Sequence, residues 1–140
     1  MSVGGNVEVV AVELSDPTGS QERIANTLTT DPTINGILTL GPTGAAPALA
    51  ALQASGAAGR VRLGTFDLSP EVLRAVADGQ MEFAIDQQQY LQGYLPIIFM
   101  NEYLKTRALP GGNNPVLTGP GFVTRENAAD VIALSEAGVR

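Results

Sequence analysis

Short apolar runs alternate with amphipathic segments along the first 88 residues. The runs have the length and the β-branched or aromatic content of buried strands, and they span 7–14, 36–40, 61–66 and 82–85. The segments between them, over 18–30, 45–54 and 70–78, have helical periodicity. Strands that alternate with helices at this spacing predict right-handed βαβ units. We therefore expect an α/β protein with a parallel sheet and helices on both faces, a three-layer α/β/α arrangement.

Turn and capping residues mark the ends of the predicted helices. Thr18 and Gln21 match the two ends of a capping box, which predicts a helix start at this point. Gly56 is placed as a C-terminal glycine, and Ser69 with Pro70 as an N-cap followed by a first-turn proline.

The last third of the chain has a different pattern. Residues 90–107 predict a helix, kinked or begun near Pro96, that is apolar around most of its circumference and is expected to be buried. A turn-rich loop follows. Residues 116–118 are a candidate short strand, and Thr124 is the expected cap of a final helix.

The composition argues against several classes of partner and of catalytic chemistry. A net charge of −6 with a single lysine argues against nucleic acid and anionic membranes as partners. Because the chain has no cysteine and no histidine, thiolate chemistry, disulfides and the commonest general base are excluded. No apolar run reaches the roughly 18 residues of a membrane span, and the first ten residues lack the pattern of a leader. We expect no cofactor and no metal.

In parallel sheets, ligands bind beyond the carboxyl ends of the strands, which draws attention to Asp67. It stands in GTFD directly after a predicted central strand. It could accept hydrogen bonds from ligand hydroxyls, be phosphorylated, or cap a loop without any ligand, which is common turn chemistry. A receiver domain would need an acidic pair after its first strand and a lysine after its last, so we rank that interpretation low.

Other motifs fit less well. A dehalogenase-like phosphatase needs a second aspartate at the position of Ser69, and the turn at 41–48 does not match a dinucleotide-binding glycine motif. Asp16, Asp67 and Asp86 could hold Mg²⁺, but solvated loop acids are the better interpretation. No nucleophile, base and orienting group come together, so we do not expect an enzyme.

Three consecutive glutamines, 87–89, follow the fourth predicted strand. Glutamine offers donors and acceptors without a fixed charge, which suits the alternating hydroxyls of a neutral sugar or polyol. The alternative is that these side chains only bind loop backbone, and the run alone favours this alternative.

Four segments together resemble the C-terminal half of a type I periplasmic binding protein. They are GTFD at 64–67, PEVLRAVADGQ at 70–80, MEFAIDQQQYLQGYLP at 81–96 and GPGFVTREN at 119–127. The resemblance runs from Val7 to about Ala133 and is greatest to ribose-binding-like sugar receptors of ABC importers. It implies a flavodoxin-like lobe, with a second lobe closing over the sugar.

The resemblance also implies which residues meet the sugar. Asp67 would accept hydrogen bonds from its hydroxyls and Gln87 would add a polar contact, with Phe66 supporting the cleft wall. Some relatives have an asparagine where this chain has Gly41, so Thr43 is expected to replace that contact or the contact is lost.

Receptors of this family are about twice as long as this chain, so we expect a single lobe, partial relative to the family. Residues 1–88 would form the βα core, 89–110 a helix that packs with the missing lobe in relatives, and 111–140 a return segment and final helix. Without that lobe, the apolar helix 90–107 is expected to recruit a second copy or to pack back on the sheet.

The resemblance predicts the solute-binding component of an ABC transporter that recognises a neutral sugar or polyol. Its partners would be the importer's membrane subunits, in the periplasm or another extracytoplasmic compartment, with the leader absent from this chain. The alternative is the effector-binding core of a lactose-repressor-type regulator, which shares the two-lobed core. A receiver-like signalling domain ranks below both.

Overall fold

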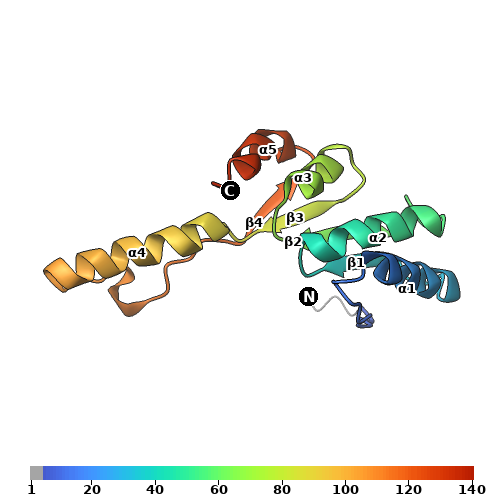
Figure 1. The fold of residues 1–140 in the computed structure, drawn as a ribbon, viewed down its shortest axis with the longest axis horizontal. Helices are drawn as coiled ribbons and strands as arrows, with labels where there is room; N and C mark the ends of the chain where they lie inside the picture. Colours follow the sequence, from blue (N-terminus) through green and yellow to red (C-terminus); the bar gives the residue numbers. More distant parts are fainter. Residues whose placement is uncertain (1–4) are drawn as a thin grey trace.

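A four-stranded sheet connects the helices of this chain (Figure 1). The computed structural model describes residues 5–140. Its elements, in chain order, are α1 (Pro17–Thr30), β1 (Gly36–Thr39), α2 (Pro42–Ala54), β2 (Arg62–Phe66), α3 (Pro70–Ala77), β3 (Phe83–Asp86), α4 (Gln89–Thr106), the 3-10 helix η1 (Pro110–Asn113), β4 (Gly121–Thr124) and α5 (Ala128–Glu136). The α/β class predicted from the sequence is confirmed.

The strands lie in the order β1-β2-β3-β4, and the sheet is mixed. β1, β2 and β3 are parallel, whereas β4 runs antiparallel to β3, with Gly121 opposite Asp86. The predicted parallel arrangement is thus found for β1, β2 and β3, and the last strand departs from it. After β3 the chain continues through α4 and returns to the sheet at the carboxyl end of β3. β4 therefore begins beside the end of β3 and runs in the opposite direction.

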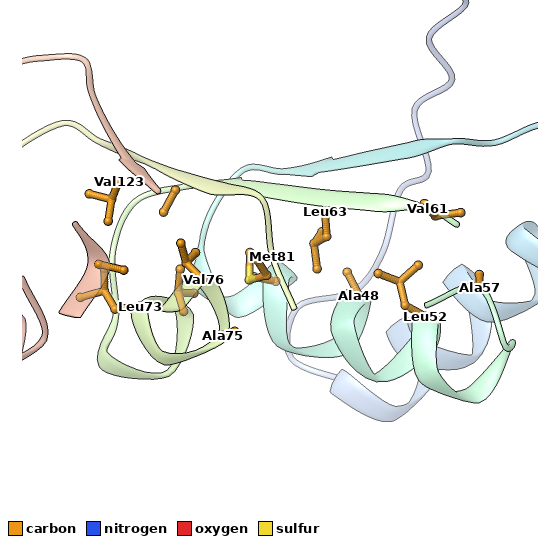
Figure 2. Packing of buried hydrophobic residues seen from close by; sticks show 14 of the residues in the cluster. Ala48, Leu52, Ala57, Val61, Leu63, Leu73, Ala75, Val76, Met81 and Val123 are labelled. Carbon is orange, nitrogen blue, oxygen red and sulfur yellow. The ribbon is translucent and has the colours of Figure 1, made fainter. Parts of the chain in front are cut away.

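The helices cover one face of the sheet. Each parallel connection steps in the same direction across the sheet, so right-handed crossovers place α2 and α3 on the same side. α1 packs against α2, and α5 packs against α3. One hydrophobic core lies between these helices and the sheet, and Figure 2 shows its side chains below the strands. Its fully buried members include Leu63, Leu73, Val76, Ala84 and Val123.

The opposite face of the sheet is more open. Residues paired across the strands share a face, so Leu38, Gly64 and Phe83 point away from the helices. The Phe83 ring lies over Gly64, where an added Cβ would come within 2.6 Å of the ring. Leu38 and Phe122 on this face are more than half exposed. The described residues thus supply the sheet and one helical layer of the predicted three-layer arrangement.

The strand predicted over 7–14 is not formed. Residues 5–13 have no regular secondary structure, and Val7 and Val9 are 91% and 87% exposed. A strand is stabilised by hydrogen bonds to a neighbour, and no strand in residues 5–140 pairs with this segment. The prediction is wrong because an apolar β-branched run makes a strand only where a partner strand is present.

Two of the predicted helix starts are also wrong. α1 begins one residue before Thr18, and its N-cap is Asp16, whose Oδ1 accepts a hydrogen bond from the Gly19 amide at 3.0 Å, so the capping box is not used. α5 has Asn127 rather than Thr124 at its N-cap position.

Of the other local predictions, two are confirmed and one is wrong. The N-cap at Ser69 and the left-handed glycine at Gly56 are confirmed. The candidate strand at 116–118 is wrong, since the last strand lies at Gly121–Thr124. A segment that has no partner strand beside it remains a loop even when its residues favour strands.

The predicted apolar helix is present as α4, but it is not buried. It runs without interruption through Pro96 and extends away from the sheet (Figure 1). None of its 18 residues, all of them described by the structure, falls in the buried class. Across residues 5–140, α4 included, no helix combines the length and apolar character that crossing a membrane requires.

Candidate functional site

The carboxyl ends of the parallel strands bring the predicted site residues to one edge of the sheet. Thr39 lies beside Thr65, and Phe66 beside Ile85, so β1, β2 and β3 end almost level. Asp67 directly follows β2 and Gln87 directly follows β3. Residues separated by 20 positions in the sequence therefore lie next to each other at this edge.

Asp67 and Gln87 are joined by a hydrogen bond. Gln87 Nε2 donates to Asp67 Oδ1 over 2.7 Å, and the Asp67 amide donates to the Ile85 carbonyl over 2.9 Å. Asp67 has a φ of 63°, a left-handed conformation that costs energy for a residue with a side chain but that Asp tolerates better than most. The fold thus holds a carboxylate and an amide together, both of them half-buried.

Two side chains and one close backbone approach hold the backbone after β3 in place. The Gln87 carbonyl accepts hydrogen bonds from Thr118 Oγ1 and from Gln92 Nε2, each over 2.9 Å. A Cβ at Gly119 would lie 2.8 Å from the Asp86 carbonyl oxygen, so only glycine fits there. The outgoing segment to α4 and the incoming segment to β4 therefore pass close together, which fixes the position of Gln87.

The three glutamines have different roles. Gln87 binds Asp67, as described above. Gln88 has a left-handed backbone with a φ of 56°, and its backbone N–H donates a hydrogen bond to Asp86 Oδ1 over 2.7 Å. Gln89 begins α4 and lines a cavity of about 460 Å³. The alternative that the sequence favoured, side chains bound only to loop backbone, does not describe Gln87, whose side chain binds the Asp67 carboxylate.

The cavity beside Asp67 is lined by polar and apolar residues from four parts of the chain. Its lining comprises Pro42, Asp67, Leu68, Ser69, Pro70, Gln89, Tyr90, Ser135, Gly138 and Arg140. A second hollow, of about 600 Å³, lies along α1 and is lined by Glu8 and by residues of and just after that helix. No predicted site residue lines this second hollow, so the cavity beside Asp67 is the better candidate for a ligand site.

The other predicted site residues lie near this cavity without lining it. Gly41 is the N-cap position of α2 and Thr43 is exposed in the first turn, on either side of the lining residue Pro42. Phe66 ends β2 with a half-buried side chain on the face of the sheet away from the helices. The fold brings Asp67 and Gln87 into contact but leaves Gly41, Thr43 and Phe66 around them.

Most of the lining residues were not predicted as site residues from the sequence, among them Tyr90 and Arg140. Tyr90 is only a few positions from Gln87, and its place in the first turn of α4 could have indicated it. Arg140 is brought to the cavity by α5, and its side chain binds Asp86, 54 positions earlier. No local pattern could have indicated that contact.

The carboxylates with clearly shifted pKa values lie elsewhere. Hydrogen bonds from Ser15 lower the pKa of Glu13, those from Thr33 lower the pKa of Asp31, and the Glu71 pKa is lowered by its own backbone amide and by Ser69. Within residues 5–140, no group of three acidic side chains is arranged to hold a metal ion.

The family model for the periplasmic binding protein domain matches residues 2–108. The chain belongs to this family. It is similar to a carbohydrate transporter from Acidothermus cellulolyticus, solved in complex with myo-inositol, with 34% identity and a TM-score of 0.81 over 90% of this chain and 43% of that one. The predicted type I periplasmic-binding-protein lobe is thereby confirmed.

Two further relatives support this assignment. A periplasmic solute-binding protein of an ABC transporter from Actinobacillus succinogenes, solved with D-allose, has 25% identity and a TM-score of 0.70 over 81% of this chain and 39% of that one. A xylose/arabinose-binding protein of Sulfolobus acidocaldarius is 39% identical over 69 residues, which are 49% of this chain and 17% of that protein. The chain thus spans less than half the length of each of these relatives.

Proposed function

We propose that this chain is a ligand-binding lobe of the solute-binding component of an ABC transporter, and that its ligand is a sugar or polyol. The observation that carries the proposal is the Asp67–Gln87 pair at the carboxyl edge of the sheet, next to a cavity of about 460 Å³. Relatives with the same fold are described as transporter components bound to myo-inositol and D-allose. These are neutral molecules rich in hydroxyl groups.

The chemistry of the pair suits such a ligand. In the structure, Asp67 Oδ1 and Gln87 Nε2 bind each other. Asp67 Oδ2 and Gln87 Oε1 can still accept hydrogen bonds from ligand hydroxyls, and the second Gln87 N–H can donate one. We propose Gly41 and Thr43 as neighbouring contacts and Phe66 as a wall residue. A charged ligand would call for an ion-pairing partner, whereas a neutral polyol matches this set of groups.

We propose residues 1–88 as the binding core, 89–110 as the helix that leads toward an opposing lobe, and 111–140 as the return segment. Ligands in this kind of fold are held between two walls that exclude water. One wall alone should bind weakly, with a Kd of about 1 mM, equivalent to about −4 kcal/mol.

Titration of the isotope-labelled chain with myo-inositol, D-allose and L-arabinose, followed by NMR, tests the proposal. We expect saturable chemical-shift changes at Asp67, Gln87 and Gln89 for at least one of these ligands. Gln87→Ala and Asp67→Asn should each abolish the changes, because each removes hydrogen-bonding groups from the pair. Asparagine keeps the left-handed backbone at position 67 accessible, so the second variant adds no backbone strain.

Gln80→Ala is the matched control, since Gln80 is an exposed glutamine before β3, at the opposite edge of the sheet. It should leave every shift change intact. Saturable binding that survives in both site variants would move the ligand away from this edge. Absence of binding for all three ligands in the unmodified chain would contradict the proposed function itself.

The remaining proposals concern location and assembly. The periplasmic solute-binding protein from Actinobacillus succinogenes supports an extracytoplasmic location and importer subunits as partners. The exposed apolar side chains of α4, with Ile97 at 61% and Leu104 at 71%, support association of this chain with a second copy. Such a homo-oligomer would cover the exposed apolar surface of α4.

A further inference from the structure

Asp86 is a buried carboxylate that the proposed sugar contacts do not use. It is the last residue of β3, and none of its surface is exposed. Its neighbour Gln87 is half-buried and turned toward Asp67. A carboxylate in such a place costs stability unless it is paired with a cation and fully hydrogen-bonded.

Both oxygens of Asp86 have partners. Oδ1 accepts a hydrogen bond from the Gln88 amide, and Oδ2 accepts one from Arg140 Nε, each over 2.7 Å. Arg140 follows α5 and its side chain is 40% exposed, so it reaches from the surface to the buried carboxylate. One charged group thus binds both the backbone that starts α4 and the segment that follows α5.

The position of this ion pair relates it to the candidate site. The Gln88 amide that Asp86 holds belongs to the left-handed residue at which the chain turns from β3 into α4. Gln87 lies between these two residues, so its backbone is fixed on both sides. Arg140 also lines the cavity together with Asp67. Loss of the ion pair would release the turn that orients the Gln87 side chain.

We propose that Arg140, acting through Asp86, is a positioning residue for the ligand site. It neutralises the buried carboxylate, which in turn holds the Gln88 turn and keeps Gln87 Nε2 on Asp67. This inference rests on the proposed function for its effect on sugar affinity. Its effect on the Gln88 turn can be measured without any ligand.

The first test compares sugar affinity in matched variants of the chain, by the same NMR titration. Arg140→Gln should raise the Kd about tenfold or more, because it leaves the buried carboxylate without its cation. Arg140→Lys keeps the charge and should recover part of the loss. In the double variant Asp86→Asn, Arg140→Gln, no unpaired charge remains, so its affinity should exceed that of Arg140→Gln alone.

Two controls separate positioning from general stability. Arg74→Gln removes a different ion pair, to Glu136, which connects α3 to α5 with both side chains about half exposed. Val76→Ala destabilises the core without touching the site. At a temperature where all variants are folded, both controls should change the Kd less than about twofold. If Arg140→Gln weakens binding no more than Val76→Ala does, the positioning role is overturned.

The second test uses hydrogen exchange of the chain without sugar. In Arg140→Gln, the Gln88 amide should exchange about tenfold faster, while core amides such as that of Leu63 keep their protection. Arg74→Gln should leave the Gln88 amide unchanged. If the unmodified chain binds no sugar, the proposed function fails and this measurement alone decides the role of the pair. An unchanged exchange rate at Gln88 in Arg140→Gln overturns it.

Discussion

The three longest helices in residues 5–140 differ in what holds them in place. α1 and α2 pack against each other, and α2 also packs on β1 and β2, with Leu28, Ala48 and Leu52 buried. α4 is longer and at least as rich in large apolar residues, yet none of its residues, all described by the structure, is buried. Apolar content alone therefore does not determine burial, because a helix is buried only where another element faces it.

The distribution of apolar residues also separates α3 from α4. α3 has its buried residues Val72, Leu73 and Val76 on one side and charged residues on the other. In α4 the apolar residues are spread around the helix, so no single face is directed at the sheet. A helix that is apolar on every side is buried only if other elements pack against more than one of its sides. In this structure the helices pack against one face of the sheet.

The largest effect that tests this comparison is a truncation in the core. Leu73→Ala should lower the free energy of unfolding by about 2–5 kcal/mol, because it removes a fully buried side chain and leaves a cavity. Ile97→Ala in α4 should change it by less than about 0.5 kcal/mol, since Ile97 is 61% exposed. Urea denaturation of both variants measures the difference. Equal losses would mean that α4 is packed in solution.

The second effect concerns association rather than folding. If α4 recruits a second copy, light scattering should give twice the mass of one chain, and Ile97→Gln with Leu104→Gln should return it to one chain. Glutamine is a good helix former, so stability should change by less than about 0.5 kcal/mol. The control is Asn101→Gln, an exposed polar position on the same helix. A monomeric unmodified chain would rule out the homo-oligomer.

Much of the fold can be predicted from the sequence, because the alternation of runs encodes it. β2, α3 and β3 lie within a residue or so of their predicted ranges, and Ser69 begins α3 as expected. The failed strand predictions share one physical cause. Residues 7–14 and 116–118 have strand-like composition, but a strand depends on a neighbour that local sequence does not specify. The antiparallel direction of β4 likewise depends on how the chain returns from α4.

The candidate site is predictable to a lesser degree. The rule that ligands lie beyond the carboxyl ends of parallel strands draws attention to Asp67 and Gln87, and their ligand contacts are implied by the family resemblance. The structure joins the two side chains by a hydrogen bond. Arg140 could not be found in this way, because it reaches the site through tertiary packing of α5. Asp86 was interpreted as a solvated loop acid in preference to a Mg²⁺ ligand, and that interpretation is wrong because its side chain is fully buried.

The smallest effect is a pH dependence in the exposed turn between α1 and β1. The Thr33 hydroxyl and amide both donate to Asp31 Oδ1, and these hydrogen bonds lower the Asp31 pKa below 3.8. A carboxylate with a lowered folded-state pKa contributes stability above its unfolded pKa and loses it as the pH falls through the folded value. Thr33→Ala removes the hydroxyl, so an NMR titration should show the Asp31 pKa rising toward 3.8.

The same variant should lose stability at neutral pH, and its difference from the unmodified chain should shrink as the pH falls below the ordinary range of aspartate. Thr29→Ala is the control, because its hydroxyl donates to the Ala25 carbonyl and not to a carboxylate. Its effect on stability should not depend on pH in this range. If the loss of stability in Thr33→Ala does not depend on pH, the charge of Asp31 does not stabilise the turn. The turn would then be stabilised by its backbone geometry, as the packed helices are stabilised by their contacts.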